Sequence, residues 1–162
     1  RSEPIDLAWP SMIHDFCTTR DWVVFILCPL VFSIENAMKG GSLMAWEAER
    51  GLRLGVMPRN GGNADVKWFE TDPGYVFHPM NAWADAGRIV LDVCRFDRLT
   101  FMDPPEVQRT ITEDVNPHPH RWTIDLERGG VKEERLDDVM AEFPRIDDRL
   151  NQTALVGAAV HY

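Results

Sequence analysis

The chain has 162 residues, enough for one domain of ordinary size with a buried core. Its 44% hydrophobic and 27% charged residues are typical of a soluble globular protein, and its net charge of −9 argues against a nucleic-acid partner, because binding a polyanion requires a basic face. The three cysteines, Cys17, Cys28 and Cys94, form no C-x-x-C pair, so we expect reduced, buried thiols and a cytoplasmic location. The longest apolar run, residues 22–32, contains Pro29 and is too short to span a bilayer, which leaves membrane association undecided.

Short apolar runs separated by turn residues follow one another along the chain. Such runs, without a convincing amphipathic helix between them, predict an all-β fold. A short helix is conceivable only at residues 106–114, inside the longest irregular stretch, residues 97–119. In chain order, the expected strands are residues 5–9, 12–16, 22–30, 43–46, 52–57, 66–70, 75–83, 88–96, 121–127 and 131–136.

One histidine-bearing apolar segment recurs along the chain at a fixed spacing. His78 lies within Tyr75-Val76-Phe77-His78-Pro79-Met80-Asn81-Ala82-Trp83, and His14 occupies the matching place 64 positions earlier. Glu142 stands 64 positions later, in a third apolar segment, residues 140–146. A second apolar run follows each of the three segments, at residues 22–27, 88–93 and 154–160. A fixed period of this kind predicts a repeated structural unit.

About four strands fall between one histidine and the next, which is the content of one propeller blade. In a propeller, the innermost strands of successive blades run along the central axis. Residues at one height on those strands converge, so His14, His78 and Glu142 would face one another across the channel. Convergent neutral imidazoles suit a divalent first-row metal.

Other polar residues have simpler interpretations. A lone histidine in an apolar strand is more often a core residue than a ligand, and only the equal spacing of His14 and His78 favours the ligand interpretation. His118 and His120 lie among prolines in a polar stretch, and we expect them to be solvated. Asp15 follows His14 directly, so it points to the opposite face of a strand and is expected to hydrogen-bond into the loop.

Five motifs, in this order along the chain, resemble those of the carotenoid cleavage oxygenases, and Gly55-Val56-Met57-Pro58-Arg59 adds a likeness to the bacterial lignostilbene dioxygenase branch. Together they span nearly the whole chain. The motifs are Ser11-Met12-Ile13-His14-Asp15-Phe16, Trp68-Phe69-Glu70, Val76-Phe77-His78-Pro79-Met80-Asn81-Ala82-Trp83, Arg121-Trp122-Thr123-Ile124-Asp125-Leu126 and Glu142-Phe143-Pro144-Arg145-Ile146-Asp147.

The resemblance implies a seven-bladed β-propeller with one non-haem Fe(II) on its axis, held by four histidines. His14 and His78 match two of these ligands, and Glu142 matches a glutamate that accepts a hydrogen bond from a ligand imidazole, here that of His78. The implied reaction uses O2 to cleave the C=C bond of a stilbenoid or apocarotenoid into two carbonyl products, without an organic cofactor. Phe16 and Met80, two residues beyond the histidines, are candidates for lining the substrate cavity.

Two alternatives accompany this interpretation. By residue type alone, His14, His78 and Glu142 also match a facial triad of two histidines and one carboxylate, but that triad normally sits in a jelly roll with two ligands close in sequence. The chain holds two of four ligands and about two to three blades, so we expect residues 1–162 to be a single partial propeller domain from a longer chain, inactive by itself. The alternative function is a metal-free propeller segment that serves as an interaction or scaffold module.

Overall fold

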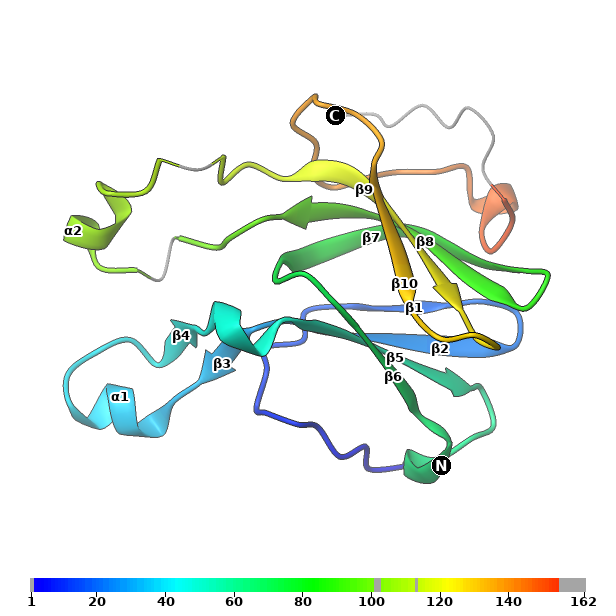
Figure 1. The fold of residues 1–162 in the computed structure, drawn as a ribbon, viewed down its shortest axis with the longest axis horizontal. Helices are drawn as coiled ribbons and strands as arrows, with labels where there is room; N and C mark the ends of the chain where they lie inside the picture. Colours follow the sequence, from blue (N-terminus) through cyan, green and yellow to red (C-terminus); the bar gives the residue numbers. More distant parts are fainter. Residues whose placement is uncertain (1, 101–102, 113, 155–162) are drawn as a thin grey trace.

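The computed structural model describes residues 2–100, 103–112 and 114–154. Two four-stranded antiparallel sheets make up most of this part of the chain (Figure 1). The first has the strand order β1-β2-β5-β6 and the second the order β10-β9-β8-β7. Their strands are β1 (Phe16–Thr18), β2 (Trp22–Leu27), β5 (Leu52–Pro58), β6 (Lys67–Thr71), β7 (Tyr75–Asp85), β8 (Arg88–Phe96), β9 (His118–Asp125) and β10 (Val131–Arg135).

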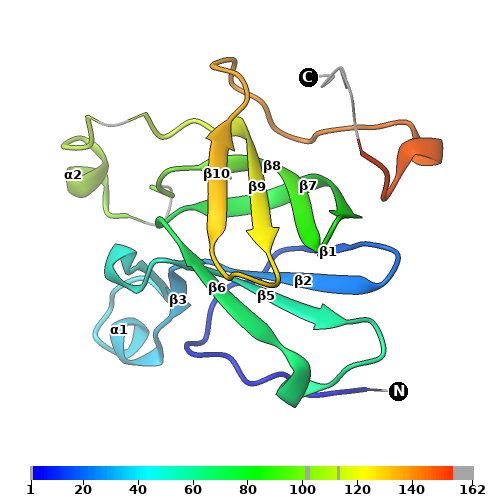
Figure 2. The same cartoon turned by 45° about the vertical axis from the view of Figure 1, so that its right-hand side comes forward.

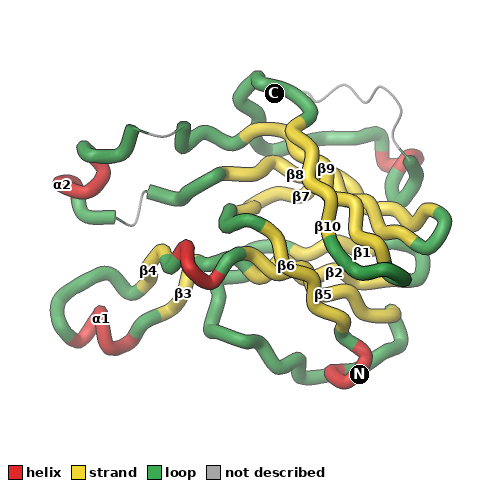
Figure 3. The backbone as a smooth tube through the Cα atoms, viewed as in Figure 1, coloured by secondary structure: helices red, strands yellow, loops and turns green. Residues whose placement is uncertain are grey.

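Several short elements lie outside the two sheets. The loops around β3, α1 and β4, and the loop that carries α2, extend from the same side of the molecule (Figures 1 and 3). The described part of the chain holds no helix long and apolar enough to cross a membrane. The small elements are β3 (Leu30–Phe32), α1 (Ile34–Met38), β4 (Met44–Trp46), α2 (Pro105–Gln108) and three 3₁₀ turns, Ala48–Arg50, Asn63–Asp65 and Asp148–Leu150.

The two sheets pack face to face, with the core between them (Figure 2). The edge strand β1 of the first sheet contacts the edge strand β7 of the second. The opposite edge strands, β6 and β10, are also in contact. This is the relation between neighbouring blades of a propeller, with β1 and β7 innermost. Fully buried side chains from both sheets fill the interface, among them Leu54, Val56, Tyr75, Leu91 and Trp122.

A two-residue hairpin loop and a bulge set the register of β7. Ala86 and Gly87, with φ of 45° and 80°, form the loop to β8, and two positive φ values are what a tight hairpin with right-handed twist requires. The register between β7 and β8 shifts between Val76 and Pro79, and again between Pro79 and Asn81. Pro79 has no N–H to give to the ladder, which explains a bulge at this point. His78 therefore sits where the strand bends.

The all-β prediction is confirmed, and most predicted strands lie within about two residues of an observed one. Four predictions were wrong. Residues 5–9 form no strand, the strand expected at 12–16 begins only at Phe16, and the run 22–30 is divided into β2 and β3 around Pro29. Residues 140–146 are irregular as well, so Glu142 does not lie on a third inner strand. Most of the run predicted at 154–160 lies outside the described residues.

Candidate metal centre

His14 and His78 are neighbours in the folded chain. Their ring centroids are 5.1 Å apart and the rings are nearly perpendicular, with an interplanar angle of 80°. His14 lies in irregular backbone two residues before β1, and His78 lies in the bulged part of β7. Within the described part of the chain, His14 is exposed and the side chain of His78 is 27% exposed.

Hydrogen bonds determine the tautomer of both rings. Nδ1 of His14 donates to the carbonyl oxygen of Phe77 at 3.0 Å, and Nδ1 of His78 donates to Oε2 of Glu142 at 2.7 Å. A carbonyl oxygen accepts only, and an ionised carboxylate also accepts only, so the proton of each neutral ring lies on Nδ1. The lone pair of each ring is then on Nε2. An acceptor that takes the N–H of the other ring nitrogen is the usual partner of a metal-binding histidine.

Glu142 approaches His78 from an irregular segment instead of from a strand. Its Oε2 accepts two hydrogen bonds, from His78 Nδ1 and from the backbone N–H of Phe143 at 2.6 Å. Its Oε1 is buried and has no hydrogen-bond partner within the described ranges. The structure therefore brings together the three residues of the predicted site, but the contact of Glu142 with His78 does not require the third strand that the repeat predicted.

The donor set fits part of a first-row metal site. Two neutral imidazole nitrogens suit such an ion, and a ring separation of 5.1 Å is compatible with bonds of about 2.0–2.1 Å from one ion to each ring. Within residues 2–100, 103–112 and 114–154, no group of three or more His, Cys, Asp or Glu side chains is arranged to hold a metal. His14 and His78 thus form at most half of a coordination sphere.

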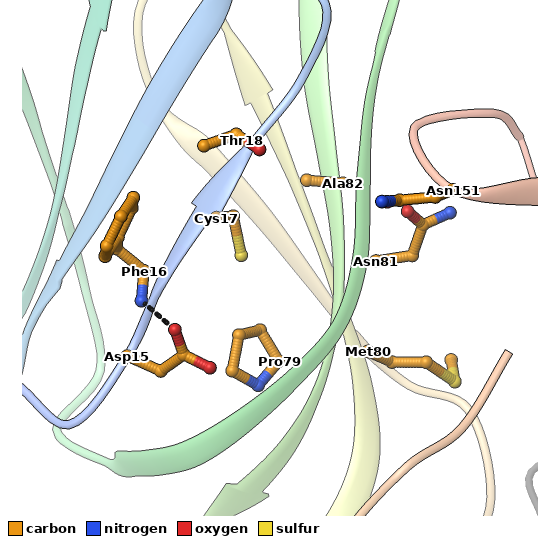
Figure 4. A pocket seen from close by; sticks show the side chains of 9 residues that line it. All are labelled: Asp15, Phe16, Cys17, Thr18, Pro79, Met80, Asn81, Ala82 and Asn151. Carbon is orange, nitrogen blue, oxygen red and sulfur yellow. Dashed lines mark hydrogen bonds between the residues drawn. The ribbon is translucent and has the colours of Figure 1, made fainter. Parts of the chain in front are cut away.

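Phe16 and Met80 both border a shallow pocket of about 170 Å³ between β1 and β7. Neither His14 nor His78 lines this pocket, and the side chains of Phe16 and Met80 point to opposite sides in Figure 4. Their role in lining a substrate cavity stays a prediction. Asp15, at the same pocket, accepts a hydrogen bond from the N–H of Phe16 at 2.8 Å, as expected for a residue that bonds into the loop.

The prediction that His118 and His120 are solvated was wrong. Both lie on β9, and they are only 6% and 8% exposed. His118 Nε2 pairs with Asp114 at 2.7 Å and His120 Nδ1 pairs with Glu133 at 2.9 Å. The prolines around them belong to the start of a buried strand, so a polar composition was a poor guide to burial here.

The cysteines are free and buried, as predicted. Burial raises the pKa of Cys28 and Cys94 to about 12, and it raises that of Cys17 further. Thiols in this state are protonated at neutral pH and are poor nucleophiles and poor metal ligands. The residues that sequence reasoning missed are Phe77, whose carbonyl orients His14, and Phe143, which contacts both Glu142 and His78.

The two sheets pack as neighbouring propeller blades do, and two imidazoles lie together beside their inner strands. The chain is therefore of the class of propeller proteins, and it carries part of a candidate metal centre. The family model described as RPE65, retinal pigment epithelial membrane protein, matches residues 1–154, and the chain belongs to this family, that of the carotenoid cleavage oxygenases. The predicted family is therefore confirmed.

Individual relatives agree with this assignment. Isoeugenol monooxygenase from Pseudomonas putida is 34% identical over 142 residues, which cover 86% of this chain and 30% of the relative. A carotenoid cleavage oxygenase from Mycobacterium tuberculosis is 33% identical, over 93% of this chain and 38% of the relative. The crystal structure of a lignostilbene dioxygenase from Pseudomonas brassicacearum superimposes with a TM-score of 0.78 at 32% identity, over 90% of this chain and 31% of that one. The chain thus spans about a third of the length of its relatives, and its fold is part of a propeller.

Proposed function

We propose that the protein to which this chain belongs is a non-haem Fe(II) dioxygenase that cleaves an alkene C=C bond with O2. The observation that supports this proposal best is the pair of imidazoles of His14 and His78. Their ring centroids are 5.1 Å apart, and the Nδ1–H of each ring is hydrogen-bonded to an acceptor. In this proposal Nε2 of each ring binds the iron, and further ligands come from parts of the protein other than the described residues. When bound, Fe(II) supplies the site at which O2 is activated toward the double bond.

The residues of this chain position the ligands. The Phe77 carbonyl and the Glu142 carboxylate keep the proton on Nδ1 and fix the plane of each ring, so both lone pairs are available without a rotation or a proton transfer. The carboxylate also makes the His78 nitrogen a better donor. The products contain both oxygen atoms of O2, one in each of two carbonyl groups.

The proposed substrate is a stilbenoid or an apocarotenoid. The names of the similar proteins, isoeugenol monooxygenase, lignostilbene dioxygenase and carotenoid cleavage oxygenase, support this class and do not choose within it. Incubating the full natural protein with an aromatic alkene and with an apocarotenoid, and measuring the aldehydes formed, would choose between the two. We also propose a cytoplasmic location, and that residues 1–162 are inactive when isolated.

The decisive test is the His78→Ala variant of the full natural protein. It should lose iron retention, measured by metal analysis after gel filtration, and turnover with it, because one of the two described ligands is removed. His118→Gln is the matched control, since His118 also pairs with a carboxylate but lies on β9, and it should keep its iron. Full iron occupancy in His78→Ala would refute the proposal. A wild-type protein that binds no iron would favour the scaffold alternative.

A further inference from the structure

Phe143 has an unusual backbone for a large aromatic residue. Its φ is 53°, in the left-handed region that bulky side chains rarely adopt, and the residue is 70% exposed in the described part of the chain. Residues in this region persist when surrounding contacts require them, and they often lie at functional sites.

Two contacts of Phe143 with described residues lead to the candidate metal centre. Its backbone N–H donates to Oε2 of Glu142 at 2.6 Å, the same oxygen that accepts Nδ1 of His78 at 2.7 Å. Its ring lies 4.4 Å from the His78 ring, at an interplanar angle of 33°. The left-handed turn therefore lets one residue hold the Glu142 carboxylate with its backbone and cover the His78 imidazole with its side chain.

We propose that Phe143 is a positioning residue for His78, acting both directly and through Glu142. It fixes the orientation of the carboxylate, and hence the Nδ1–H tautomer and the ring plane of His78, so that Nε2 is presented in one direction. This inference rests on the proposed function in that the presented nitrogen is taken to bind iron. The geometry of Phe143, Glu142 and His78 itself does not depend on iron.

Glycine provides the clearest contrast at this position. A glycine adopts positive φ at little cost and keeps the N–H bond to Glu142, but it removes the ring over His78. If the only requirement were a left-handed turn, glycine would serve at least as well as phenylalanine. The presence of phenylalanine at an unfavourable φ therefore points to a use for its ring.

The test compares Phe143→Gly, Phe143→Leu and Phe143→Tyr in the full natural protein. Iron retention is measured by competition with a chelator, and the His78 tautomer by nitrogen-15 NMR of histidine-labelled, metal-free protein. Glycine, which keeps the backbone N–H bond to Glu142, should weaken iron retention about 10-fold through loss of the ring, the lower end for loss of a partner of a metal ligand, and should leave the His78 tautomer unchanged. Leucine lacks the ring and also disfavours a positive φ, so it should weaken iron retention at least as much and should mix the His78 tautomers. Tyrosine keeps the ring and should stay within about 3-fold of wild type. Phe32→Leu, which changes another exposed phenylalanine on β3, is the control and should have no effect.

Two outcomes would overturn this inference. Wild-type iron retention together with an unchanged His78 tautomer in the glycine and leucine variants would show that the ring has no positioning role. If the tyrosine variant also lost iron retention, the site would tolerate no substitution at residue 143, and the effect could not be assigned to the aromatic ring. A wild-type protein without iron would refute the proposed function instead, and the NMR comparison would then decide the role of Phe143 alone.

Discussion

At the scale of single residues, two departures from regular structure create the contact between His78 and Glu142. Pro79 interrupts the ladder of β7 with β8, and the bulge directs the backbone at His78 away from a regular strand. The left-handed turn at Phe143 brings Glu142 toward the same point. Hydrogen bonds and ring contacts then hold both conformations, so the geometry of the pair depends on irregular backbone more than on the repeat of the blades.

Glu142→Gln should weaken iron retention and turnover of the full protein by about 10–100-fold while the fold is kept. The amide oxygen of glutamine still accepts from His78 Nδ1 and Phe143 N–H, but it carries no charge and polarises the imidazole less. The amide NH₂ must also take the buried place of Oε1, which has no partner among the described residues.

Metal analysis and steady-state kinetics measure the effect, and a thermal melt checks the fold. Glu127→Gln, an exposed glutamate near the β9–β10 turn, is the control and should behave as wild type. An unchanged iron content and rate in Glu142→Gln would mean that Glu142 has no influence on the metal centre.

At the scale of elements, apolar residues were a sufficient guide to β8 and β9, because residues 89–95 of β8 are all buried and the later part of β9 alternates between buried and half-buried side chains. The boundaries of β1 and β2 were not predictable in this way. Ile13 is apolar but lies outside β1 and packs against the cluster that contains Leu27 and Val31, and Ser11 forms an isolated bridge with Val31. Burial of His118 and His120 depends on partners distant in sequence, such as Glu133, which composition alone does not reveal.

The candidate site was partly predictable for a related reason. The spacing of His14 and His78 reflects two successive blades, and the structure brings these histidines together. Glu142 reaches His78 through the irregular segment after β10, so the equal spacing of 64 positions is not the cause of that contact. The positive φ of Phe143 has no sequence signal, since left-handed backbone is normally associated with Gly or Asn.

Gly55→Ala should destabilise the first sheet by about 1–3 kcal/mol, the usual cost of an overpacked site. Gly55 faces Trp68 across β5 and β6, and a Cβ at Gly55 would lie 2.6–2.9 Å from three carbons of the indole ring. The indole itself packs against Trp9, Leu27 and Val31, which restricts its movement.

Urea unfolding of the full protein measures this effect, and the same substitution in a Trp68→Leu background is the control. The smaller leucine removes the clash, so the cost of Gly55→Ala should fall in that background. Equal costs in both backgrounds would show that the Trp68 ring is not what makes glycine necessary.

At the scale of the whole molecule, polar contacts join the two sheets at the outer end of their interface. Thr71 Oγ1, at the end of β6, donates to Glu133 of β10 at 3.1 Å, and Arg95 of β8 donates to the carbonyl of Pro73 at 2.8 Å. Near the inner strands, Gln152 links the two sheets: its backbone N–H donates to Asn81 of β7 at 2.9 Å, and its side-chain Nε2 donates to Thr18 of β1 at 3.2 Å. The apolar interface and these contacts together fix one blade against the next, which is what keeps His14 of one blade beside His78 of the other.

The stability of the fold should depend on pH through Glu133, which contacts Thr71 of the first sheet and several residues of its own sheet. Burial by itself would raise the pKa of Glu133, but hydrogen bonds from His120 and Trp122 and the charge of Arg95 outweigh it and lower that pKa to about 2, from an ordinary value of 4.5. The carboxylate is ionised more readily in the folded than in the unfolded chain. Its stabilising contribution is therefore complete above pH 4.5 and is lost as the pH falls from 4.5 toward 2.

Glu133→Gln should lower the free energy of unfolding of the full protein by about 1–3 kcal/mol at pH 7, because the donors around it lose a charged acceptor. The difference between wild type and variant should shrink on acidification, since the wild type loses the same contribution between pH 4.5 and 2. Urea unfolding at a series of pH values measures both effects. Glu134→Gln, a neighbour on β10 that pairs with Lys132 at the surface, is the control and should change stability little. A difference for Glu133→Gln that stays constant from pH 7 to pH 2 would show that the charge of Glu133 does not stabilise the fold.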